Sequence, residues 1–216
     1  MIIRSAGLTQ TDGVTWEIPL AAVTVAGGVV TVITDLRTFI KNLGGGGRVL
    51  INRTLLIATG TIDWTSIPSI FKELEIHIHA QSNAATVSFD SAKITFNGDS
   101  GANYNRMENQ TDESETEIID WLISQTFLSM GEFPALSNTT GWGEAVFRIP
   151  AYTKAGQKNI FGDYMGWNTN GYFISGSSAG VWLSVAAINR ITIIGEWGTP
   201  NNHFKIGSEF SLWGIL

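Results

Sequence analysis

Hydrophobic and polar residues alternate with a period of two over much of this chain. The clearest case is the segment 73–80, ELEIHIHA, which places Leu74, Ile76, Ile78 and Ala80 on one face. Glutamate and histidine side chains occupy the other face. Such alternation is typical of a β-strand with one buried face, so this segment is predicted to be a half-buried strand.

Further short apolar segments follow, each bounded by Gly, Asn, Pro or Ser. They read GEAVFRIPAY, KNIFGDYMGW, GYFISG, VWLSV, NRITIIGEW and EFSLWGIL. Many short strands separated by turn residues favour an antiparallel β-sandwich or a jelly roll. The predicted fold class is therefore all-β. The terminal segment is apolar on both faces, which predicts a central strand or one packed on a neighbouring subunit.

The segment 109–133 is the only stretch that could form a helix. Ser114 and Glu117 have the spacing of a helix capping box, but the apolar positions fit a helical period only weakly. The part EIIDWLISQTFL can equally be a strand with both faces buried. We favour the strand, because the segments around it are all β-like.

The first 43 residues form a candidate separate arm. Two strand-like runs flank Gly27-Gly28, which predicts a hairpin, and Pro19 is expected at a strand edge or a bulge. Four glycines at 44–47 follow, and their high backbone entropy makes them the best candidate linker. The predicted organisation is a β-rich arm (1–43), a linker (44–47) and a β-sandwich (48–216).

Composition restricts the classes of partner. Charged residues make up 15% of the chain and hydrophobic residues 44%, which suggests that partner subunits cover some apolar surface. The net charge is −6 and no basic run appears, so a nucleic-acid partner is not expected. The absence of cysteine excludes disulfides. We expect neither a secretory signal nor a membrane-spanning segment, because no sufficiently long apolar run occurs.

The stretch ITFNGDSGANY, residues 94–104, raises the question of a ligand loop. Its GDSG part lacks a plausible histidine base, and no Gly-Lys-Ser/Thr follows, so neither a catalytic serine nor a phosphate loop is supported. Asp99, Ser100 and Asn103 could offer oxygens to a calcium ion. The favoured interpretation is a plain turn, since Asn and Gly tolerate positive φ. Just before this stretch, the apolar residues switch from odd-numbered to even-numbered positions, which predicts a bulge near Asp90 and Ser91.

His77 and His79 are the candidate metal ligands. They stand two residues apart on one strand face, and a third ligand would have to come from elsewhere in the fold. The favoured alternative is a solvated strand face or a contact between protomers. No other cofactor is expected.

Trp142, Trp167 and Trp197 lie in loops rich in Gly and Asn and are candidate platforms for a sugar ring. The alternative is that these aromatic residues fill a core or a subunit interface. Acidic residues do cluster at 115–120, but in a run that looks solvated, and glycoside hydrolysis needs a facing pair across a cleft. The sequence therefore does not predict an enzyme.

Two stretches resemble structural proteins of tailed bacteriophages. The first, WEIPLAAVTVAGGVVTVITDLRTFI (16–40), is similar to a motif of phage fibre and baseplate-associated proteins, and its marker positions include Trp16, Pro19, Asp35 and Arg37. The second resemblance is to a β-sandwich module of virion-surface proteins. It rests on IPSIFKELEIHIHAQS, ITFNGDSGANY and the ending INRITIIGEW…FKIGSEFSLWGIL.

This resemblance implies a non-enzymatic virion protein, assembled in the host cytoplasm and exposed on the particle surface. A tail-fibre or adhesin-type protein that mediates host attachment is expected, with a capsid decoration protein and a carbohydrate-binding module as alternatives. Expected partners are its own copies in a homotrimer, other virion proteins (capsid, baseplate or fibre adaptor) and a host-surface glycan. The arm would dock on the particle through Trp16, Pro19, Asp35 and Arg37.

Overall fold

The structure is a computed structural model that describes residues 21–26, 29–35, 47–85, 87–112, 117–135, 141–167, 173–196 and 203–216. The chain divides into two compact units, Met1–Gly45 and Gly46–Leu216. All regular elements in the described residues are β-strands. The all-β class predicted from the hydrophobic pattern is therefore confirmed.

The N-terminal unit contains a two-stranded antiparallel ribbon. It is formed by β1 (Ala21–Ala26) and β2 (Val29–Asp35), and Ala26 pairs with Val29 across the intervening glycines. The pairing register shifts between Thr24 and Val25, as at a β-bulge. This agrees with the predicted hairpin. Of the four docking residues, only Asp35 lies in the described part, as the last residue of β2.

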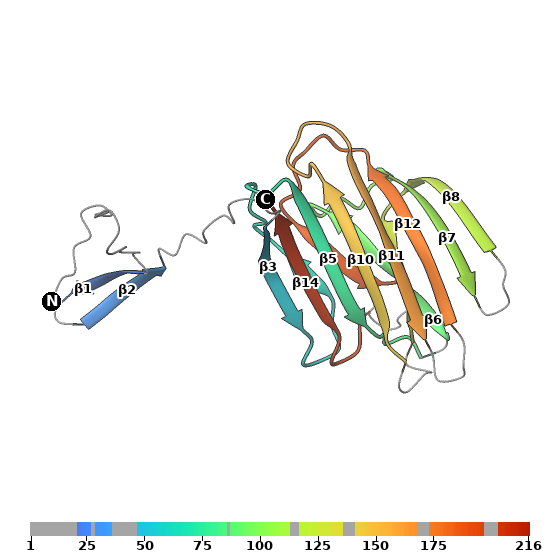
Figure 1. The fold of residues 1–216 in the computed structure, drawn as a ribbon, viewed down its shortest axis with the longest axis horizontal. Helices are drawn as coiled ribbons and strands as arrows, with labels where there is room; N and C mark the ends of the chain where they lie inside the picture. The colour runs from blue at the N-terminus through green and yellow to red at the C-terminus, as the bar shows by residue number, and fades with distance from the viewer. Residues whose placement is uncertain are drawn as a thin grey trace, which may run out of the picture. The chain divides into compact units, whose positions relative to one another are not determined.

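The larger unit is a β-sandwich of two antiparallel sheets (Figure 1). In sheet order, the eight-stranded sheet consists of β3 (Arg48–Leu55), β14 (Glu209–Ile215), β5 (Glu73–Ala80), β10 (Gly143–Pro150), β11 (Lys158–Trp167), β12 (Phe173–Trp182), β7 (Tyr104–Asp112) and β8 (Glu117–Gln125). The four-stranded sheet consists of β4 (Ile62–Trp64), β13 (Ile191–Gly195), β6 (Phe89–Phe96) and β9 (Leu128–Pro134). The C-terminal strand β14 lies between β3 and β5. It is therefore a central strand, which was one of the two predicted alternatives.

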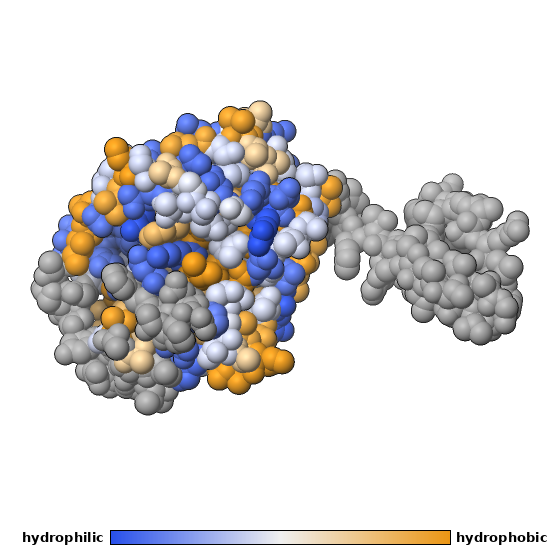
Figure 2. Space-filling view, turned by 180° about the vertical axis from the view of Figure 1, so that it is seen from behind, coloured by the Kyte–Doolittle hydropathy of each residue, from blue (hydrophilic) through white to orange (hydrophobic). Residues whose placement is uncertain are grey.

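The core lies between the two sheets. The alternating residues of β5 point into it, and Leu74, Ile76, Ile78 and Ala80 are almost completely buried, which confirms the half-buried strand. Burying one such side chain stabilises the fold by about 1.5–3 kcal/mol. The reverse side of the molecule mixes hydrophilic and hydrophobic residues (Figure 2).

The bulge predicted near Asp90 is present, because the register between β6 and β9 shifts between Ser91 and Lys93. The switch of the apolar residues from odd-numbered to even-numbered positions has a second cause: the polar residue Asp90 occupies one of the inward positions and is buried. It accepts hydrogen bonds from the Ser82 hydroxyl and, at 3.1 Å, from the Glu196 backbone N–H. The polar partners make this inward carboxylate tolerable.

The segment at 117–125 requires one correction. It is a strand, as favoured, but its two faces are not buried: Ile118, Ile119, Trp121 and Ile123 are all exposed. The reason is its position, because β8 is the last strand of the eight-stranded sheet and, among the described strands, has a neighbour on one side only (Figure 1). Composition alone could not distinguish a central strand from an apolar edge strand.

Candidate functional site

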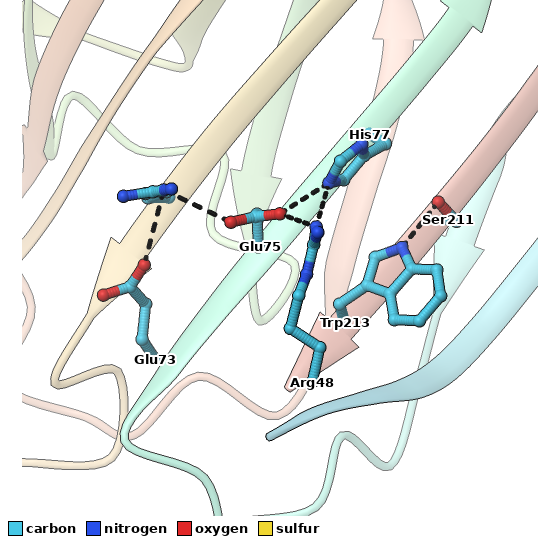
Figure 3. Close-up of polar contacts among 7 residues, drawn as sticks. Arg48, Glu73, Glu75, His77, Ser211 and Trp213 are labelled. Atoms are coloured by element: carbon cyan, nitrogen blue, oxygen red, sulfur yellow. Dashed lines mark hydrogen bonds and ion pairs between the residues drawn. The ribbon is translucent and has the colours of Figure 1, made fainter. Parts of the chain in front are cut away.

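The outer face of the eight-stranded sheet, the side turned away from the four-stranded sheet, carries the predicted histidines. At one end of this face Arg48, Glu73, Glu75, His77 and Arg148 form a charged cluster on β3, β5 and β10 (Figure 3). Glu75 is its centre, although its side chain is only 7% exposed. It contacts Arg48 and His77, and its second oxygen lies 3.2 Å from the Arg148 guanidinium.

The positive and negative charges of this cluster are equal in number. Burial lowers the pKa of His77, and the positive charge of Arg48 lowers it further, so the imidazole is neutral at neutral pH. Two arginines then face two glutamates. The Trp213 ring closes the cluster on one side, with the Arg48 guanidinium 5.3 Å from its centroid. The charged cluster is therefore an internally paired network that stabilises the outer face.

His79 lies in a separate pair. Its ring contacts the Glu144 carboxylate and stacks on Trp142, with centroids 4.8 Å apart and planes 8° from parallel. Both candidate histidines thus have protein partners. Among the residues that the structure describes, no group of three or more His, Asp or Glu side chains is arranged to hold a metal ion.

The structure brings two of the three candidate sugar-binding tryptophans to one end of the outer face. Gly143 pairs with Gly166, and Trp142 and Trp167 each lie one residue beyond this pair. Trp167 is 57% exposed, whereas one face of the Trp142 ring is occupied by His79. Trp197 lies outside the described residues. Trp167 is therefore the better placed of the two for a ligand.

Two pockets lie along the outer side of β12, which we call together the outer groove, and sequence reasoning missed them. The three outward residues in the middle of β12 are small: Ser175, Ser177 and Ala179. The neighbouring strand β11 places Met165 and Phe161 directly opposite Ser175 and Ala179. Short side chains on one strand and long ones on its neighbours leave a trough. A signal existed in the run SGSSAG, but only the sheet order shows that larger residues flank it.

One part of the outer groove carries most of its hydrogen-bonding side chains, although the larger share of its surface is apolar. This part has a volume of about 640 Å³ and lies over β10, β11, β12 and β7. Its hydrogen-bonding side chains are Asn109, Thr111, Glu144, Asp163, Ser175 and Ser177. Met165 and Phe173 add apolar surface beside them. Such a lining can bind hydroxyl groups and an adjoining apolar ring face.

The second part of the outer groove is apolar. It has a volume of about 440 Å³, and its lining includes Met107, Trp121, Phe161 and Val181. Met107 pairs with Trp121 across β7 and β8, and with Ala179 across β7 and β12. Both volumes lie in the range of small-ligand sites, about 300–1,000 Å³.

A small acidic pocket of about 130 Å³ lies on the inner side of β7, lined by Glu108, Asp120 and Glu132 among others. Burial raises the pKa of Glu132 to about 7, and the negative charges of Glu108, Asp90 and Glu196 contribute. Burial likewise raises the pKa of Glu108, whose Oε1 has no hydrogen-bond partner among the described residues. The carboxylates in and around this pocket therefore repel one another.

The ITFNGDSGANY stretch forms a turn. Phe96 C=O accepts a hydrogen bond of 2.9 Å from the Asp99 N–H, and Asn97 and Gly98 both have positive φ, 53° and 72°. These φ values and this hydrogen bond are typical of a type I′ turn, which here leads from β6 in the smaller sheet towards β7 in the larger one. The Asp99 carboxylate accepts hydrogen bonds from Trp182 Nε1 at 2.8 Å and the Gly101 N–H at 2.9 Å. Its oxygens hold the loop to the core, which supports the interpretation as a turn.

In comparisons with known proteins, no family model, curated protein or solved structure matches this chain. No helix in the described part of the chain is long and apolar enough to span a membrane.

Proposed function

We propose that this chain is a non-enzymatic surface protein of a bacteriophage particle, which attaches the particle to a host-surface glycan. The particle assignment rests on the sequence resemblance of segment 16–40 and of the sandwich to virion proteins. The division into a small N-terminal unit and a larger sandwich is compatible with one part that docks and another that binds. The outer groove is the observation that carries the binding role.

The chemistry of the outer groove suits a saccharide. A sugar ring has an apolar face, which packs on aromatic side chains, and a rim of hydroxyl groups, which need donors and acceptors. Phe161 and Trp121 supply the first kind of surface, and Asp163, Asn109 and Ser177 supply the second. Trp167, paired with Phe173 across β11 and β12, adds a second aromatic surface beside the other end of the groove.

Binding of the purified chain to polysaccharide extracted from a host surface tests the proposal. Phe161→Ala and Asp163→Ala change the apolar and polar parts of the groove separately, and each is expected to weaken binding. Ile57→Ala is the matched control, because Ile57 is an 85% exposed apolar residue outside the groove. Equal binding by all variants would reject the groove as the site, and release of sugar fragments would indicate an enzyme.

A capsid decoration protein is the second candidate, favoured by the apolar residues exposed along β8, which suit burial against a protein partner. Imaging of particles with a labelled antibody to the sandwich separates the two candidates by location. Label over the whole head would favour decoration, and label at the tail tip would favour attachment.

A further inference from the structure

The free edge of β8 differs from the other sheet edges. Natural proteins protect edge strands by keeping them short, or by placing Lys, Pro or a bulge on them. β4 is only three residues long, and β9 ends in Pro134. β3 carries Arg48 and Arg53. β8 spans nine residues with neither a proline nor a basic residue. Its one bulge lies near its C-terminal end, where the register with β7 shifts between Leu122 and Gln125 and Ser124 has a φ of 53°. Residues 117–122 therefore form a regular edge without these protections.

The side chains of β8 are apolar on both faces of the sheet. On the outer face, Ile119, Trp121 and Ile123 are 64%, 70% and 61% exposed, and Ile118 on the inner face is 43% exposed. β6 and β9 contact each other within the smaller sheet, which has only half as many strands as the larger one. An edge strand with unpaired backbone groups and exposed apolar residues is a surface for adding another strand.

We infer that β8 pairs antiparallel with β8 of a second copy of this chain, so that two eight-stranded sheets become one continuous sheet. The sequence of β8 supports a second copy as the pairing partner, because the strand is complementary to itself. A twofold axis perpendicular to the sheet keeps outer residues opposite outer residues. The register centred on Trp121, the midpoint of β8, pairs the residues on either side of it up to the bulge near Ser124.

This register brings no like charges together. Its central pairs are Ile119 with Ile123, Asp120 with Leu122, and Trp121 with its own counterpart. A register centred on Asp120 would instead place two carboxylates directly opposite, which is unfavourable. Aromatic and β-branched pairs across strands are the favourable kind.

The pairing also bears on the proposed glycan site, although it does not depend on it. Trp121 lines the apolar part of the outer groove, so the two grooves of the dimer would adjoin on one face of the sheet. Two linked sites bind a multivalent surface more tightly than one. The contact is twofold and gives a dimer, in contrast to the trimer expected from the sequence.

Sedimentation of the full chain tests the pairing. We expect a dimer at micromolar concentration, and Trp121→Lys should raise its dissociation constant by at least about 30-fold, as for a central aromatic contact. Ile57→Lys places the same charge at another exposed apolar position and should leave the dimer intact. Thermal unfolding of each variant checks that the fold is retained.

A cross-link tests the register, because the chain contains no cysteine. In Trp121→Cys the two thiols would lie directly opposite, within the Cα separation of about 4.4–6.8 Å that a disulfide requires. Mild oxidation should therefore yield a covalent dimer, whereas Ile57→Cys should not. A monomer, a trimer, or a dimer that persists in Trp121→Lys would overturn the inference. Because Trp121 itself lines the groove, glycan binding is measured with Ile119→Lys, which changes the same strand at a residue outside the groove lining. Glycan binding by that variant as a monomer would leave the proposed function standing.

Discussion

Glu132 should make the stability of the sandwich depend on pH in a direction opposite to that of most carboxylates. Burial, with the negative charges of Glu108, Asp90 and Glu196, raises its pKa to about 7 from the ordinary value of 4.5. Between these values the folded chain holds a proton that the unfolded chain has lost. The free energy of unfolding therefore falls as the pH rises from about 4.5 to about 7.

The size of this effect follows from the two pKa values. Their difference of about 2.5, at about 1.4 kcal/mol for each step of one, sets an upper limit of about 3 kcal/mol. Glu132→Gln removes the charge and keeps the shape. The variant should match the wild type near pH 4 and exceed its unfolding free energy by up to about 3 kcal/mol near pH 8.5.

Urea unfolding across this pH range measures the effect, with Glu117→Gln as the control because Glu117 lies on the exposed strand β8. The control should leave the pH dependence unchanged. If Glu132→Gln follows the wild-type curve at every pH, Glu132 does not hold its proton in the folded state and the reasoning is refuted.

Three further substitutions test other parts of the fold by chemical denaturation. Glu75→Ala leaves two arginines of the charged cluster without their shared partner and should cost about 2–4 kcal/mol; an effect below about 0.5 kcal/mol would contradict its central place. Asp99→Ala removes the acceptor for Trp182 Nε1 and should cost about 1–3 kcal/mol, with Asp99→Asn milder. Gly131→Ala should abolish folding at 37 °C, because φ is +82° and a Cβ would lie 2.1 Å from the Tyr164 ring; a soluble, cooperative variant would refute this contact.

Local pattern was sufficient to predict most of the sandwich. The alternation in ELEIHIHA identified the buried face of β5, and Asn97-Gly98 marked a turn that the structure contains. These features depend on a few adjacent residues. Their physical causes, side-chain alternation and tolerance of positive φ, act locally, so the sequence displays them directly.

The candidate site depends on sheet order, which the sequence does not display. The outer groove exists because Phe161 and Met107 lie on the two strands flanking Ala179. Trp121 and Ile119 looked suitable for a buried strand, and only the topology places them at an edge. The predicted metal and sugar residues were chosen by type, and the structure gives His79 and Trp142 each other as partners.

The position of β14 has a consequence for the synthesis of this protein. β14 lies between β3 and β5, and Arg48 near the start of the sandwich pairs with Ile215 near its end. As the chain leaves the ribosome, β3 and one edge of β5 remain without neighbours until the last strand has emerged. The larger sheet can therefore close only after β14 has been made, and pairing between segments so far apart in the sequence is slow. During that interval the nascent chain would expose two open strand edges to chaperones and to other copies of itself.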